Sequence, residues 1–141
     1  MAAFNKFNQF VEDIAKGVHN LSTGQIKVAL TNTAPVASNE VYANLTAPLA
    51  TTNLSGATPF NVTTTSAEQT SGTLKLILVD LTLTATGAVG PFQYVVLYND
   101  TPSSPADPLI GWYDYGSSIS LANTETFTID FDAANGVLTI A

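Results

Sequence analysis

The chain has no cysteine and no arginine, and it carries few charges of either sign. Without cysteine it can form no disulfide, thiolate zinc site or cysteine nucleophile. Charged residues make up 11% of the chain, and four lysines against eleven acidic residues give a net charge of −7. Because arginine and lysine supply most contacts to a phosphate backbone, this composition argues strongly against direct binding of nucleic acid.

Catalytic side chains are also scarce, because the chain has a single histidine, His19. A Ser-His-Asp triad would have to use this residue, but it lies in a turn that follows Gly17, just after a predicted helix. We interpret His19 as a surface or capping histidine. With so few catalytic groups we expect no enzymatic activity and no cofactor.

Long apolar runs are missing as well, since none approaches the roughly 20 residues of a membrane-spanning helix. Glu12 and Asp13 stand where a signal peptide would need an uninterrupted apolar region. We therefore expect a soluble protein without membrane contacts that begins at or next to Met1. With 141 residues, 45% of them hydrophobic, the chain predicts one domain over 1–141 with a buried core.

The first eighteen residues show the only convincing helical period of apolar side chains. Gly17 is placed to end this helix, so residues 1–20 are predicted as an N-terminal amphipathic helix. Its apolar stripe needs a cover, which is either the protein's own sheet or a neighbouring chain. Aromatic rings are enriched in interfaces, and we predict a contact with another chain. The stripe consists of Phe4, Phe7, Phe10, Val11, Ile14 and Val18.

Residues 21–141 have the alternating pattern of antiparallel strands separated by turn residues. The last two predicted strands form a hairpin through Asn135-Gly136, and the strand over 73–86 has a bulge near Val79. This spacing predicts an antiparallel β-sandwich or jelly-roll-like barrel with one N-terminal α-helix. The expected strands span residues 26–30, 73–86, 92–98, 109–115, 126–131 and 137–140.

A long segment from about residue 33 to 71 has no strong element and many threonines and alanines. Short strands are conceivable only over 41–45 and 60–64. Such a segment is more often a functional or assembly loop than a packed layer. The sequence alone does not assign its role.

Three aspartates and a group of aromatic residues are the candidate ligand sites. Asp130 and Asp132 share a face, and Asp114 in a neighbouring strand could join them to hold calcium or to form a glycosidase pair. Alternation with Phe127 and Ile129 also predicts a plain acidic solvent face. We favour that explanation and expect no metal site.

The aromatic group centres on Trp112, Tyr113 and Tyr115, with Tyr94 and Tyr98 nearby. These rings could form a platform on which a sugar stacks. Trp112 and Tyr113 are neighbours, however, so they point to opposite faces of one strand. One face then belongs to the core and the other to an edge or an interface, and core packing is the favoured explanation.

Five stretches carry a resemblance when they are taken together: MAAFNKFNQFVEDIAKGVHNL, IKVALTNTAP, GPFQYVVLYND, PLIGWYDYGSS and TFTIDFDAANGVLTIA. They resemble a family of small virion structural proteins of tailed bacteriophages. The resemblance covers the first 35 residues and most of 74–141. The stretch from Val36 to about Ser71 departs from it, and no single motif is diagnostic.

The resemblance implies a non-enzymatic capsid decoration (cement) protein that coats the phage head. Its partners would be the major capsid protein and sister subunits, as a homotrimer, and its place the capsid surface of the virion after synthesis in the host cytoplasm. One alternative is a tail or neck component of the virion. Another is a carbohydrate-binding β-sandwich module in which Trp112 and nearby tyrosines bind glycans weakly.

Overall fold

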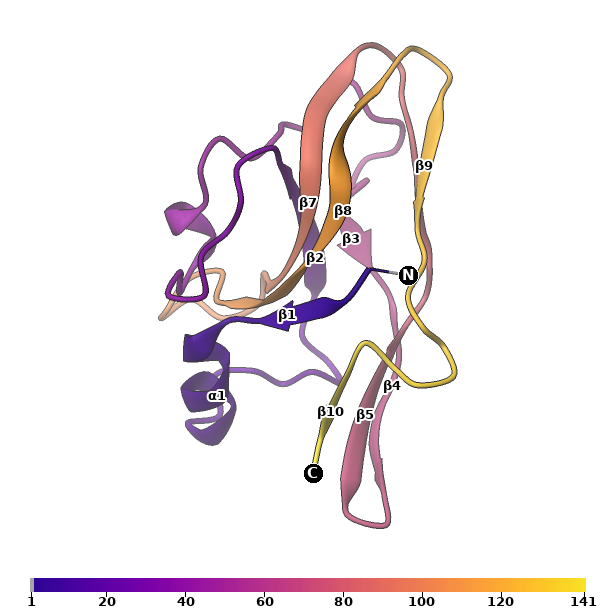
Figure 1. The fold of residues 1–141 in the computed structure, drawn as a ribbon. Helices are drawn as coiled ribbons and strands as arrows, with labels where there is room; N and C mark the ends of the chain where they lie inside the picture. Colours follow the sequence, from indigo (N-terminus) through magenta and orange to yellow (C-terminus); the bar gives the residue numbers. More distant parts are fainter. Residues whose placement is uncertain (1) are drawn as a thin grey trace.

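Two layers of antiparallel strands pack face to face, with apolar side chains of both layers in one core (Figure 1). The protein is represented by a computed structural model that describes residues 2–141. The predicted fold class, a mainly β protein with antiparallel sheets and an N-terminal α-helix, is confirmed. The first layer is a five-stranded sheet, in the order β1 (Phe4–Lys6), β8 (Leu109–Leu121), β7 (Val89–Asn99), β2 (Ile26–Thr31) and β3 (Asn61–Val62).

The second layer consists of two smaller sheets, because the strand predicted over 73–86 divides in two. At Val79 and Asp80 the chain leaves one sheet and enters the other, and the Asp80 carboxylate accepts a hydrogen bond of 2.8 Å from the backbone N–H of Phe131. The predicted bulge is therefore a change of pairing partner. The sheets are β10 (Leu138–Ile140) with β5 (Thr73–Leu78) and β4 (Thr64–Thr70), and β6 (Leu81–Thr84) with β9 (Thr126–Ile129).

The final hairpin predicted through Asn135-Gly136 is wrong, because β9 and β10 do not pair with each other. The turn itself forms, and Gly136 adopts a φ of 80°. It directs the chain away from β9 and toward β5, where Leu138 pairs with Leu76. This route places Val137 in the main core, which a simple hairpin on β9 would not require.

The helix predicted over residues 1–20 begins too early, because α1 spans only Asn8–Ala15 and the residues before it form a strand. Residues Phe4–Lys6 form β1, which pairs with the edge of β8 in the register Phe4 with Tyr113 and Lys6 with Gly111. The ring of Phe4 occupies the space above Gly111, where a side chain would otherwise stand. Backbone pairing with a free sheet edge thus overrides the helical period.

The helix ends as its sequence predicts, since Gly17 follows it in the left-handed conformation with a φ of 73°. Over residues 2–141, no helix combines the length and the apolar character needed to cross a bilayer.

Residues from the long segment over 33–71 pack on the outer face of the five-stranded sheet. This segment contains a short 3-10 helix, η1 (Tyr42–Asn44), and its Leu45 packs with Val96 and Tyr98 of β7. Ala29 of β2 is buried on the same face, and five of the six residues of β2 are buried. Residues 33–60 are irregular apart from η1, as expected, but some of their side chains pack on the sheet. The last part of the segment forms β4, which lies at the edge of its sheet. Its residues are mostly polar, so they do not show the apolar alternation from which a strand is predicted.

The close approach of Phe4 to Gly111 yields a test of the β1 pairing. A Cβ added at Gly111 would clash with the Phe4 ring and lie 2.5 Å from the backbone oxygen of Asn5. We expect Gly111→Ala to displace β1 and to lower the free energy of unfolding by about 1–3 kcal/mol. Hydrogen exchange of the β1 amides measures the displacement, and Ser117→Ala, at an exposed position of β8, is the control. Unchanged exchange in Gly111→Ala would contradict the close packing.

Candidate functional site

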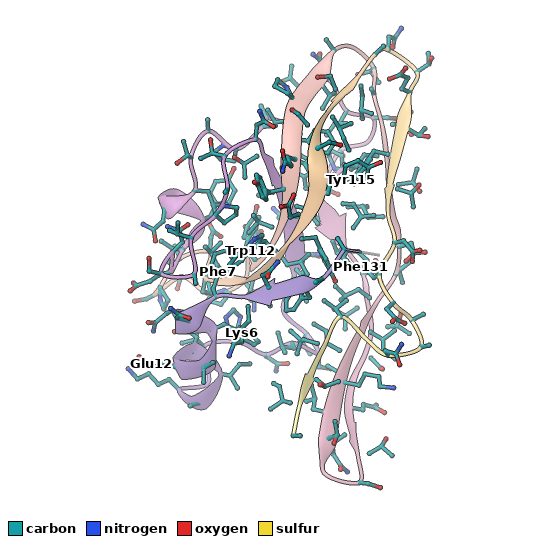
Figure 2. All side chains as sticks on the ribbon, viewed as in Figure 1. Lys6, Phe7, Glu12, Trp112, Tyr115 and Phe131 are labelled. Carbon is teal, nitrogen blue, oxygen red and sulfur yellow. The ribbon has the colours of Figure 1, made fainter. Side chains whose placement is uncertain are left out.

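Eight of the nine residues considered for an interface lie in three places, one of which is core, and the ninth, Val18, lies apart from them. Phe7 is fully buried, and its ring lies 4.6 Å from the ring of Trp112 (Figure 2). Both belong to the cluster on the outer face of the five-stranded sheet. Phe7 begins α1 as its N-cap in an extended conformation, which turns the side chain under the sheet edge. Phe7 therefore offers no surface to a partner.

Four other residues of the predicted stripe line one groove, which we call the N-terminal groove. Its cavity volume is about 210 Å³, and it lies between β1 and α1 on one side and β10 on the other. Val11 is 53% exposed there, whereas Phe10 is buried beneath it. Val18 is half-buried and lies outside the groove. The groove is lined by Phe4, Lys6, Phe10, Val11, Ile14, Leu138, Thr139 and Ile140.

Lys6 is the cationic residue of the N-terminal groove. The other three lysines are engaged: Lys16 pairs with Glu12, Lys27 lies 2.9 Å from Asp100, and Lys75 donates to a backbone oxygen. Within residues 2–141, Lys6 makes no ion pair or side-chain hydrogen bond. The groove thus combines an apolar floor with one free ammonium group.

Tyr113 and Tyr115 line a second concave surface, the aromatic cleft, which has a cavity volume of about 360 Å³. Tyr115 is 57% exposed, and its ring stands edge to face with that of Phe127 at 5.7 Å. Burial, with a smaller contribution from the charge of Asp132, raises the pKa of Tyr113 to about 12, so its hydroxyl stays neutral. The cleft is lined by Ala2, Val95, Tyr113, Tyr115, Phe127, Thr128, Ile129 and Asp130.

A bulge in β8 holds Tyr115 in this position. The pairing of β7 with β8 moves from Phe92 opposite Ile119 to Tyr94 opposite Asp114, which leaves extra residues in β8. The Asp114 carboxylate accepts hydrogen bonds from the Gly116 backbone N–H at 2.7 Å and from the Gln93 side chain at 3.0 Å. These bonds fix the base of the bulge. Bulges often redirect a side chain at a functional site.

The three aspartates weighed as ligand groups do not converge. Asp114 supports the bulge, and Asp130 lines the aromatic cleft. Asp132 lies in the turn before β10, where hydrogen bonds from the backbone and side chain of Asn135 lower the pKa of its carboxyl group. Across residues 2–141, no cluster of three or more histidine, aspartate or glutamate side chains is arranged to hold a metal ion.

His19 is buried, so its interpretation as a surface or capping residue is wrong. After Gly17 the chain folds back onto the helix, and the imidazole ring lies 5.2 Å from that of Phe10. Its Nδ1 is 3.3 Å from the Asn99 side-chain nitrogen. Burial lowers the pKa of His19, and the nearby charge of Asp13 opposes this effect only partly.

Comparisons of the chain with protein-family models, with curated proteins and with solved structures found no match.

The buried histidine predicts a pH dependence of stability. Because the folded-state pKa of His19 lies below its ordinary value of 6.5, the unfolded chain binds the proton more readily. The contribution of His19 to the free energy of unfolding is therefore fully present above pH 6.5. It falls as the pH drops below 6.5, by at most about 1.4 kcal/mol per pH unit. Urea unfolding at pH 7.5 and 5.5 measures this difference. The variant His19→Gln should lose it, and a variant that kept the same slope would refute the assignment.

Proposed function

We propose that the protein is a non-enzymatic structural protein of a tailed-phage virion. Its role is that of a capsid decoration protein that binds the outer head surface and stabilises contacts between capsid subunits. The observation that carries this proposal is the N-terminal groove. Its two walls, from residues 4–14 and from 138–140, both lie in stretches that resemble the phage family.

The groove supplies a physical basis for docking. In the groove, Val11 is exposed beside the apolar side chains of Phe4, Ile14 and Ile140. A bound partner would shield this apolar surface from water. Burying such surface contributes about 25 cal/mol per Å² before the cost of association is subtracted. A decoration protein binds many equivalent sites on one shell, so modest affinity at each joint suffices to stabilise the particle.

The partners in this proposal are the major capsid protein and sister subunits in a homotrimer. The trimer follows from the family resemblance, in which decoration proteins occupy local threefold positions. A tail or neck location in the same virion is the nearest alternative. Labelling of the protein on intact particles distinguishes these two locations.

A carbohydrate-binding module is a second candidate, and the aromatic cleft is the feature that favours it. Exposed Tyr115 and its partner Phe127 form an aromatic surface. Trp112 does not contribute, because it packs against Phe7 on the opposite face of the sheet. Binding of the purified protein on a glycan array would favour this candidate over capsid decoration.

Docking through the groove predicts a selective loss of particle binding in Val11→Ser. Removing an exposed valine should change the stability of the free protein by less than about 0.5 kcal/mol. On the particle the same side chain would be buried, so binding per site should weaken about tenfold. The measurement is cosedimentation of the purified protein with capsids that lack it, prepared from the phage whose genome encodes this chain.

Two further variants complete this experiment. Val79→Ser removes a valine of similar exposure, 49%, from outside the groove and should bind normally. Phe7→Ala should instead destabilise the free protein by about 3–5 kcal/mol, because it opens a cavity in the core. Equal capsid binding by the wild type, Val11→Ser and Val79→Ser would exclude the groove as the docking surface. Absence of capsid binding by the wild type would refute decoration itself.

A further inference from the structure

The aromatic cleft has the composition of a site for a cation. Tyr113, Tyr115 and Phe127 line one cavity of about 360 Å³, and the exposed residue Asp130, which directly follows β9, is among its other lining residues. The face of an aromatic ring is electrostatically negative and attracts ammonium and guanidinium groups. Several rings with a carboxylate therefore suit a positively charged group better than an anion.

The geometry of the rings supports this assignment. Tyr115 and Phe127 meet at an interplanar angle of 73°, so they form two nearly perpendicular walls (Figure 2 shows Tyr115 on β8). Phe127 is held from behind by the ring of Phe92, at 5.2 Å and 79°. On the other side, the bulge fixes the backbone next to Tyr115 through Asp114. Both walls are thus in place before any ligand arrives.

The charges around the cleft point the same way. Besides Asp130, the carboxylate of Asp132 is near enough to contribute to the raised pKa of Tyr113. No lysine lines the cleft among the residues that the structure describes. The whole chain carries a net charge of −7. A cation that enters therefore meets acidic groups without an internal competitor.

We infer that the aromatic cleft binds a cationic side chain of a partner protein, with arginine as the best-fitting group. A planar guanidinium group can stack on one ring while it donates hydrogen bonds to a carboxylate. A second copy of this chain cannot supply that group, because the sequence contains no arginine. Three of its four lysines are already engaged. An arginine in this cleft must therefore come from a different protein.

This inference does not depend on the capsid proposal, and the isolated protein tests it. The probe is N-acetyl-arginine amide, titrated into labelled protein and followed by NMR. Its matched neutral control is N-acetyl-citrulline amide, which has nearly the same shape without the charge. Methyl glucoside is added in a separate titration as the carbohydrate arm. We expect saturable shifts at Tyr115, Phe127, Thr128 and Asp130 with the arginine compound only.

Four variants distinguish the contribution of the Tyr115 ring from that of the Asp130 charge. Tyr115→Phe keeps an aromatic face and should bind like the wild type, whereas Tyr115→Leu keeps bulk without the face and should bind about two- to fivefold more weakly. Asp130→Asn should weaken binding and should make the affinity depend less on the salt concentration. Glu68→Gln makes the same change of charge on exposed β4, outside the cleft, and should have no effect.

The contrary outcomes are equally distinct. Equal binding of the citrulline compound would show that the cation is not recognised. Saturable binding of methyl glucoside without binding of the arginine compound would identify a sugar cleft instead. If the arginine compound gave no saturable shift at these four residues, or gave shifts elsewhere, the inference would be wrong.

Discussion

The pairing of β1 with the first residues of β8 is the interaction on which both candidate surfaces depend. β8 has thirteen residues and β1 only three, so β1 covers the edge of β8 from Gly111 to Tyr113 and no further. The N-terminal groove opens on the α1 and β10 side of β1, and the aromatic cleft lies toward β9. Without a side chain at Gly111, Phe4 can seal this junction.

Most strands of the sandwich could be predicted from sequence because alternating burial is a local pattern. The predictions fail where the position of a residue depends on contacts with elements that are distant in the sequence. Phe4 and Phe7 fit a helical period, but Phe4 lies in β1, which pairs with the edge of β8, and Phe7 is buried in the core. The turn at Gly136 forms as its sequence predicts, yet the strand after it pairs with β5. His19 is buried because the chain folds back, which no local pattern reveals.

The candidate surfaces were predictable only in part. The apolar stripe predicts the helix that contains α1, but only the register of β1 and the position of β10 show that Val11 stays exposed while Phe10 does not. Tyr115 meets Phe127 across a corner between two sheets, through a bulge that alternation does not anticipate. The sequence signal for that bulge is Gly116, which adopts a φ of 93°.

The side of the sandwich around β1 is the proposed binding surface, and a phage capsid is the proposed partner. A cryo-electron microscopy map of the decorated particle tests both. We expect density of the major capsid protein against Val11 and Ile140 in the N-terminal groove. A map in which this groove faces solvent, with the protein held through another face or absent from the head, would refute the proposal.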